Sequence, residues 1–394
     1  MKMQLQLILF FGAFLLILTL ILVYLWFSAN TFFNITNFRI KFIFLLVLFV
    51  LTWSFPVSMF IERVSESVIS RGYYFFSAAW VGILIHLIIA TIPVWLVLIV
   101  AKYAKAKFDI KTVAIIFFSL AIVYAVYGLY NARNIRVKTV EVPIRNLTAE
   151  WEDKKIIQLS DLHLGALYGK GFLEKIVKKV NAQNPDIIFI TGDLFDGMDG
   201  STGTLVGALN SFTAPQGVYF VTGNHESYLG LDKALDILKQ TKIRVLNDEI
   251  IDLNGLQIVG ISYPEFGTTK DIKSIIQPGV NFFPEKPSIL LYHAPTSIEL
   301  NGTSSHTAAY WKPDMNFSYA KNLGINLQLS GHAHAGQLFP FTLFAYFIYN
   351  GYDYGLHTDG DFSIYTASGI GTWGPPMRTG NNPEIVEIEL VRKN

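Results

Sequence analysis

The sequence of 394 residues contains no cysteine and few charged side chains. Without cysteine the chain forms no disulfide bond, and no thiolate can act as a metal ligand or a nucleophile. Charged residues make up only 15% of the sequence and nearly cancel, to a net charge of +1, so no nucleic acid or other polyanionic partner is implied. Hydrophobic residues make up 52%, which is typical of a membrane protein.

Four uncharged stretches near the N-terminus hold most of this hydrophobicity. They are Leu7 to Phe27, Phe42 to Phe60, the residues between Arg71 and Lys102, and those between Lys111 and Arg133. A helix of about 20 apolar residues crosses the hydrocarbon core of a bilayer. We therefore predict a transmembrane region over residues 1–132, anchored in a lipid bilayer by helices at about 7–27, 42–60, 75–100 and 112–131. A cleaved signal peptide is a poorer explanation of the first stretch, because its apolar run is too long.

The positive charges between the stretches bear on the orientation in the membrane. The segment between the third and fourth stretches carries four lysines, at positions 102, 105, 107 and 111, which favours a cytoplasmic position for that segment. Arg133, Arg136 and Lys138, directly after the fourth stretch, favour the opposite orientation. Giving the four lysines more weight, we predict a multi-pass protein of the cell membrane with an extracytoplasmic C-terminal domain.

A second domain is predicted over residues 133–394, where short apolar runs alternate with polar and glycine-rich segments. The run Ile187–Ile190 is continuously apolar, as in a strand that is buried on both faces. Residues 171–180 and 231–238 have helical spacing. Because strands alternate with helices early and cluster late, we expect an α/β sandwich of two sheets flanked by helices.

Residues of the types that bind metals follow these strand-like runs. In chain order they are Asp161 and His163, Asp193 and Asp196, Asn224 and His225, His293, and His332 and His334. Five of the eight histidines of the chain belong to this set. An open α/β sheet binds ligands at the carboxyl ends of its strands. Any single histidine is better interpreted as an ordinary core or loop residue, but the shared position of all five favours a metal centre.

The composition of the set indicates the metals and their number. Imidazole, carboxylate and one amide oxygen suit manganese, iron, zinc or cobalt better than calcium or magnesium. The seven candidate ligands are Asp161, His163, Asp193, Asn224, His293, His332 and His334. Seven ligands are too many for one tetrahedral ion and fit two ions that share a bridging carboxylate. Such a pair can clamp both oxygens of a phosphoryl displacement and acidify a bridging water.

The motifs in their order resemble those of the calcineurin-like metallophosphoesterase superfamily. They are Asp161-x-His163, Gly192-Asp193-x-x-Asp196, Gly223-Asn224-His225-Glu226, His293 and Gly331-His332-x-His334. The resemblance covers roughly residues 136–394, and Ser330–Gln337 and Ser368–Thr372 resemble a bacterial membrane-associated branch. Ala333 and Ala335 depart from the pattern of that branch. The resemblance implies a four-layer αββα metallophosphoesterase sandwich and two divalent transition metal ions, with manganese favoured over iron, zinc or cobalt.

The resemblance also implies a role for each residue. It places Asp161, His163, Asp193 and His334 on one ion, and Asp193, Asn224, His293 and His332 on the other. It implies that His225 is no ligand but protonates the leaving group or stabilises the transition state, oriented by Asp196. A histidine beside a ligand, with a carboxylate to fix its tautomer, is suited to general acid catalysis. The segment after His293 is longer than usual for the family and contains His306 and Trp311, and His306 is not expected to have a direct role.

Two classes of function follow from these residues. The first is a membrane-anchored hydrolase that cleaves a phosphodiester, phosphomonoester or pyrophosphate, including lipid-linked ones, by attack of a metal-activated water. The second is a non-enzymatic membrane sensor or scaffold that retains the fold, for which a degenerate site is expected, whereas here no ligand is missing. A transporter is disfavoured because the four apolar stretches carry no charged residue.

An aromatic, uncharged segment from Leu338 to Tyr349 directly follows the last metal motif. It is too short to span a bilayer. It is either part of the domain core or an apolar lip beside the metals that enters the membrane interface, where Tyr and Phe are well suited. The second interpretation predicts that the substrate carries a lipid tail.

Overall fold

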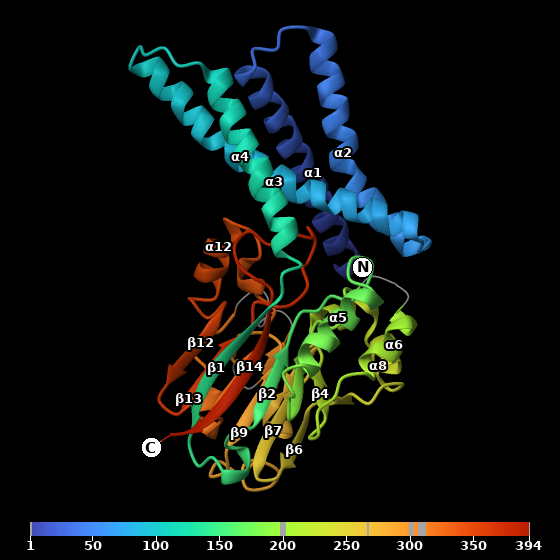
Figure 1. Ribbon diagram of the computed structural model, residues 1–394, viewed down its shortest axis with the longest axis vertical. Coiled ribbons are helices and arrows are strands. Elements are labelled where there is room, and N and C mark those ends of the chain that lie inside the picture. Colours follow the sequence, from blue (N-terminus) through green and yellow to red (C-terminus); the bar gives the residue numbers. More distant parts are fainter. Residues whose placement is uncertain (1, 198–201, 266–267, 299–302, 306–312, 394) are drawn as a thin grey trace. The chain divides into compact units, whose positions relative to one another are not determined.

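The computed structural model describes residues 2–197, 202–265, 268–298, 303–305 and 313–393. The chain divides into two compact units, which are considered separately (Figure 1). The membrane unit consists of Met1–Tyr130 and Gly374–Met377. The C-terminal unit consists of Asn131–Trp373 and Arg378–Asn394.

Four long helices form the N-terminal part of the membrane unit. They are α1 Lys2–Phe32, α2 Phe38–Val64, α3 Val68–Tyr103 and α4 Ile110–Asn131. All four are long and apolar enough to cross a membrane, as expected from the sequence. Asn37 caps α2 through its side chain, and Ser67 with Ser70 forms a capping box at the start of α3. Pro56 and Pro93 lie within α2 and α3 without ending them, as is tolerated in membrane helices.

Two six-stranded sheets form the centre of the C-terminal unit. The first has the order β1 Arg136–Ile144, β14 Glu384–Arg392, β2 Lys155–Leu159, β3 Ile187–Thr191, β4 Val218–Val221 and β5 Arg244–Val245. The second has the order β12 Gly355–Asp359, β13 Phe362–Thr366, β11 Leu327–Ser330, β9 Ser288–Tyr292, β7 Leu256–Ile261 and β6 Glu249–Leu253. A separate pair joins β8 Thr269–Asp271 to β10 Thr303–Ser305.

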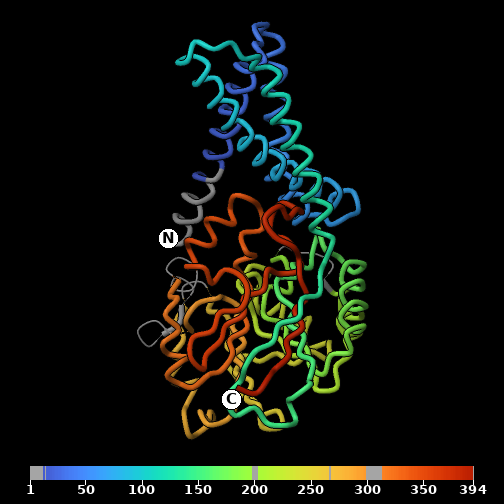
Figure 2. Tube along the Cα trace, turned by 60° about the vertical axis from the view of Figure 1, so that its left-hand side comes forward, coloured from blue at the N-terminus to red at the C-terminus, as the bar shows by residue number. Residues whose placement is uncertain are grey.

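The directions of the strands decide where their ends lie. Strands β2 to β5 are mutually parallel in the first sheet, and β7, β9, β11 and β13 are parallel in the second. The first and last strands of the unit, β1 and β14, run side by side in parallel (Figures 1 and 2). The carboxyl ends of the parallel strands within each sheet therefore meet at one edge, where α/β folds commonly bind ligands.

Several short helices accompany the sheets. The α-helices are α5 Lys170–Asn181, α6 Val206–Leu209, α7 Asn224–Leu229, α8 Leu231–Leu238, α9 Ile272–Ile275, α11 Ser318–Leu323 and α12 Phe341–Ile348. Single 3-10 turns occur at Ala149–Trp151, Thr202–Leu205 and His334–Gly336. Only α5, of these helices, is as long as three turns, so the strands carry most of the ordered core.

The alternation of side chains along the strands produces four layers. In β3, Ile188 and Ile190 join the core that includes residues of α5 and α8, whereas Ile187 and Phe189 join the core between the two sheets. In β9, Leu290 points instead into a third core with residues of α9 and α11. Each fully buried side chain of this size contributes roughly 1.5–3 kcal/mol. The expected αββα sandwich, preceded by four apolar helices, is confirmed.

Helix α12 lies within the aromatic segment that follows the last metal motif. Its side chains are largely exposed, with Phe344 58% and Phe347 77% accessible, and only Ala345 of the helix is buried. The interpretation of this segment as domain core therefore does not describe α12. Several large apolar side chains exposed on one short helix are uncommon on a water-soluble domain.

Candidate metal centre

The candidate site residues all follow strands of the two sheets, and the structure brings them together. Asp161 and His163 follow β2, Asp193 and Asp196 follow β3, and Asn224 and His225 begin α7 directly after β4. His293 follows β9, and His332 with His334 follows β11. The two sheets meet here, because His293 Nδ1 lies 2.8 Å from the main-chain oxygen of Thr191, at the end of β3. His306 and Trp311 lie outside the described residues.

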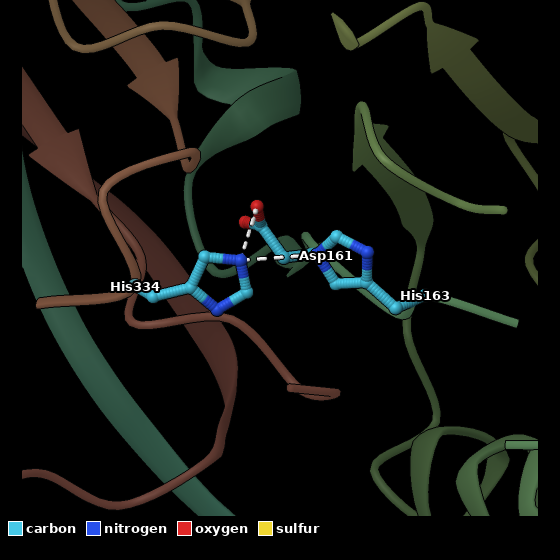
Figure 3. Close-up of side chains that lie close together, drawn as sticks. All are labelled: Asp161, His163 and His334. Atoms are coloured by element: carbon cyan, nitrogen blue, oxygen red, sulfur yellow. Dashed lines mark hydrogen bonds and ion pairs between the residues drawn. The ribbon is translucent and has the colours of Figure 1, made fainter. Parts of the chain in front are cut away.

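One group of possible ligands consists of Asp161, His163 and His334 (Figure 3). The Nε2 atoms of His163 and His334 face each other at 3.0 Å, and His334 Nε2 lies 3.3 Å from Asp161 Oδ1. All three side chains are buried. Three donor atoms that converge in this way at a buried point can hold a cation.

A second group consists of Asp193, His293 and His332. His293 Nε2 lies 3.1 Å from Asp193 Oδ2 and 3.3 Å from His332 Nδ1. Asn224 belongs beside this group, since its Oδ1 lies 3.2 Å from the same nitrogen of His293. An amide oxygen, a carboxylate and two imidazoles are a donor set that suits a divalent transition metal.

Asp193 faces both groups. Its Oδ2 lies 4.0 Å from His163 Nε2 and also 4.0 Å from His225 Nε2, in addition to its contact with His293. Burial alone raises the pKa of the Asp193 carboxyl, but the charges of His293 and His225 outweigh burial and hold its pKa well below the usual range. The same attraction raises the pKa of His293 to about 9 in spite of burial, so a cation that binds its Nε2 displaces a proton.

Hydrogen bonds behind the candidate ligands orient them. Thr191 O accepts from His293 Nδ1, so Nε2 is the nitrogen that faces the centre and would give up its proton to a cation. The carboxylate of Asp161 accepts from Ser160 Oγ at 2.5 Å and from the main-chain nitrogen of His332 at 3.1 Å. Asp193 Oδ1 accepts from the main-chain nitrogen of His225 at 2.9 Å. These bonds hold the donor atoms in place before any cation arrives.

The backbone at the centre is strained. Five candidate ligands have left-handed backbone conformations, with φ between 49° and 69°: Asp161, His163, Asp193, His332 and His334. Non-glycine residues adopt this region at a cost of about 1–3 kcal/mol each, and such residues cluster at functional sites. The neighbouring Gly223 has no room for a side chain, because a Cβ there would collide with Asp193 Oδ1.

The contact between Asp196 and His225 differs in one detail from the contact expected from the sequence. His225 Nδ1 lies 2.7 Å from the main-chain oxygen of Asp196, whereas the carboxylate of Asp196 lies 3.6 Å from His163 Nδ1. Asp196 thus meets His225 through its carbonyl, which accepts the Nδ1 hydrogen and directs Nε2 toward the centre. Burial lowers the pKa of His225, against the opposing effect of the Asp193 charge.

Glu226 is a buried residue of the site that the sequence argument did not single out. Its carboxylate accepts hydrogen bonds from the main-chain nitrogens of Gly223 at 2.6 Å, Asp193 at 3.1 Å and Phe195 at 3.1 Å. Burial, reinforced by the charge of Asp193, raises the pKa of Glu226 to about 7. Glu226 thereby ties the loop after β3 to the loop after β4. Its place in the first turn of α7, three residues after Gly223, was the available signal, as in a capping box.

The chain resembles known proteins over most of its C-terminal unit. Residues 154–336 match the family described as Calcineurin-like phosphoesterase. An uncharacterised metallophosphoesterase of Campylobacter jejuni is 33% identical over 285 residues, which cover 71% of this chain and 69% of the relative. One from Helicobacter pylori strain J99 is 33% identical over 66% of this chain and 65% of its own length.

A vertebrate relative has a similar degree of identity. A Danio rerio protein named "Transmembrane protein with metallophosphoesterase domain" is 32% identical over 68% of this chain and 60% of its own length. The chain thus spans between 60% and 69% of the lengths of these three relatives. Similarity of this extent, over the strands and loops that carry the buried donor groups, shows that the chain belongs to the calcineurin-like phosphoesterase family of metal-dependent hydrolases.

Proposed function

We propose that this protein is a membrane-anchored phosphohydrolase that uses two divalent transition metal ions to cleave a phosphoester with water. The observation that carries the proposal is the position of Asp193, whose Oδ2 lies 3.1 Å from His293 Nε2 and 4.0 Å from His163 Nε2. A carboxylate that faces two separate groups of buried donors is suited to bridge two cations. The pyrophosphates and the mono- and diesters of phosphate are the substrates to which this chemistry applies.

Seven residues would hold the ions. Asp161, His163, Asp193 and His334 would bind one, and Asp193, Asn224, His293 and His332 the other. When bound, such ions polarise the phosphoryl oxygens and lower the pKa of a water that acts as the nucleophile. The residues of the chain keep the donors oriented and the site largely dry, which strengthens electrostatic interactions within it. Manganese is our preferred ion, with iron, zinc and cobalt as alternatives.

His225 would assist the departure of the leaving group. Its Nδ1 is committed to the carbonyl of Asp196, so its Nε2, 4.0 Å from Asp193 Oδ2, is the atom that can hold a proton at the centre. In the protonated form Nε2 donates to the leaving oxygen as that oxygen gains charge. A non-enzymatic sensor or scaffold is the alternative function, but it offers no reason to retain a complete donor set and a free imidazole nitrogen beside it.

We further propose that the substrate carries a lipid tail. The exposed side chains of α12, among them Phe344 and Phe347, form an apolar lip that begins four residues after Gln337 in the loop of His334. Aromatic and aliphatic side chains of this kind bury favourably in the boundary between headgroups and acyl chains. A lip so close in sequence to the metal ligands would hold acyl chains while a phosphorylated headgroup reaches the ions.

The proposed location is the cell membrane, with the C-terminal unit outside the cytoplasm. The lysines of the segment between α3 and α4, Lys102, Lys105, Lys107 and Lys111, support this orientation. A lipid of the outer leaflet would then be a suitable substrate.

Replacement of the bridging carboxylate should remove metal and activity together. In Asp193→Asn both ions lose a charged ligand, so we expect metal content to fall from two ions per chain toward none, with loss of hydrolysis of a chromogenic phosphodiester. Elemental analysis of the purified full-length protein, reconstituted with manganese, iron or zinc, measures this. Asp236→Asn, an exposed aspartate of α8, is the matched control and should keep two ions. One ion or none in the unaltered protein would contradict the dinuclear proposal.

Replacement of His225 should slow turnover without loss of metal. His225→Ala should reduce kcat by ~10²–10⁴ for a substrate with a poor leaving group. The reduction should shrink for a leaving group that needs no proton. Because burial lowers the pKa of His225, its acid form is scarce at neutral pH, and the ratio of unaltered to variant rate should increase as the pH falls. His357→Ala, at a partly exposed histidine of β12, is the control, and metal loss in His225→Ala would make His225 a ligand.

Removal of the lip should affect lipid substrates selectively. The double variant Phe344→Ser, Phe347→Ser should lose hydrolysis of a lipid phosphoester in vesicles while it retains that of a soluble chromogenic diester. Both side chains are exposed, so the melting temperature should hardly change. Val280→Ser, which replaces an exposed apolar side chain elsewhere, should behave like the unaltered protein. Equal losses on both substrates would argue against the lip.

Two single cysteines can determine the orientation, because the natural chain has none. Lys175→Cys lies on α5 in the C-terminal unit, and Lys107→Cys lies between α3 and α4; both positions are exposed. Of the four candidate membrane helices, α4 alone lies between the two positions in sequence, so they should lie on opposite sides of the membrane. We expect an impermeant maleimide to label Lys175→Cys in intact cells and Lys107→Cys only after lysis. The reverse pattern would place the C-terminal unit in the cytoplasm.

A further inference from the structure

The loop that carries two of the candidate ligands has an unfavourable backbone. In this ligand loop, His332–Gln337, the residues His332, His334, Ala335 and Gln337 have φ values of 69°, 50°, 46° and 47°. None of these four is a glycine. Conformations of this kind persist only where the surroundings hold them. The contacts that hold the loop therefore determine where the imidazole of His334 points.

The side chain of Asn381 holds the main chain of the loop at His334 and Ala335, and Arg378 Nη2 lies 3.4 Å from Nδ1 of His334. Asn381 donates from Nδ2 to the main-chain oxygen of His334 at 2.6 Å and to that of Ala335 at 3.0 Å. Two neighbouring main-chain nitrogens, of Thr379 and Gly380, donate to the oxygen of Gln337, each at 3.1 Å. The segment Arg378–Asn381, called the clamp segment below, thus donates hydrogen bonds to three main-chain oxygens of the ligand loop, those of His334, Ala335 and Gln337.

Arg378 determines which way the amide of Asn381 faces. Its guanidinium is fully buried and donates to the main-chain oxygen of Gly371 from Nη2 at 2.6 Å and from Nε at 3.2 Å. Its Nη1 contacts Asn381 Oδ1. Because a guanidinium can only donate, Oδ1 must face it, and the NH₂ group is turned to the carbonyls of the ligand loop.

The last residue of α4 is bonded to the same segment. Asn131 Nδ2 donates to the main-chain oxygen of Asn381 at 2.8 Å and to that of Arg378 at 3.1 Å. Asn131 is itself part of the C-terminal unit and is buried. Direct hydrogen bonds therefore connect Asn131 to the clamp segment, and the clamp segment to the loop that presents His334.

We infer that Asn381 is a positioning residue for His334, oriented by Arg378 and tethered by Asn131. Its role is to aim His334, one ligand of the Asp161–His163–His334 group, because its amide donates to the main-chain oxygens of His334 and Ala335. This rests on the proposed two-metal centre. The amide is needed as a double donor, so a carboxylate of the same shape, which can only accept, cannot replace it. Groups behind metal ligands typically change metal affinity or activity by about 10–100-fold.

The test compares two identical substitutions in the full-length protein. Asn381→Asp keeps the size of the side chain and its contact with Arg378 but removes both donors to the ligand loop. Asn210→Asp is the matched control, because Asn210 also bridges main-chain groups, with Nδ2 donating to Gln240 O and Oδ1 accepting from Lys242 N. Manganese binding is titrated by equilibrium dialysis, and the ion pair is followed by the exchange-coupled electron paramagnetic resonance signal. Melting temperature is measured alongside.

The expected result is a split titration. In Asn381→Asp one of two ions should bind about 10–100-fold more weakly and the exchange-coupled signal should give way to that of a single ion, whereas Asn210→Asp should match the unaltered protein. Asn131→Ala, which keeps Asn381 itself, should weaken the binding of the same ion to a smaller extent. If Asn381→Asp does not fold, the affinity measured for Asn131→Ala tests the positioning role instead. Two ions of unaltered affinity in these variants would overturn the positioning role. Fewer than two ions in the unaltered protein would overturn the two-metal proposal itself.

Discussion

The site depends on the interaction of one buried carboxylate, Asp193, with the imidazoles around it. Removing charged and polar groups from water is costly unless they are paired. Asp193 is 2% exposed and divides its two oxygens, one accepting from the main chain at His225 and the other facing His293. The mutual attraction depresses the pKa of the carboxyl and raises that of His293. A pair of cations would satisfy the remaining donors of both groups at once.

The fold supplies this interaction with donors from both sheets. Parallel strands end at one edge, so short loops after β2, β3 and β4 meet those after β9 and β11. The loops turn through left-handed residues, which are unfavourable alone and are held by hydrogen bonds from their surroundings. Glu226 fastens the two loops of the first sheet to each other, and Asn381 fastens the loop of His334. The loops that carry the candidate ligands are thus held by residues that are not themselves candidate ligands.

The apolar surfaces of the chain suggest why such a hydrolase would be built into a membrane. Four helices are apolar enough to cross a bilayer, and α12 exposes aromatic side chains although it belongs to the C-terminal unit. Exposed apolar surface is unfavourable in water, at roughly 25 cal/mol for each Å². A lipid interface removes this cost, and a lipid substrate would present its phosphate from the same interface. Attachment and substrate choice would then have a common physical origin.

The sequence by itself determined the buried central strands, such as β3, the four apolar helices and the set of polar residues that follow the strands, but not the short strands β5, β8 and β10 or the edge strands β6 and β12. These features follow from local patterns: runs of apolar residues, their spacing, and the glycines and histidines beside them. The sandwich of two sheets could be predicted for the same reason. The residues that meet at the centre could be named without any measured distance, because parallel strands bring their carboxyl ends together at one edge of a sheet.

Only the tertiary structure decided which groups hold the ligands and which surfaces remain open. Asn381 lies 47 residues from His334 in sequence, and Asn131 lies 250 from Asn381, so no spacing could reveal their hydrogen bonds. Asp196 meets His225 through a carbonyl, an atom that every residue possesses and that a motif cannot distinguish. The exposure of α12 likewise depends on what packs against it, since the same apolar sequence can lie in a buried helix or on an exposed one.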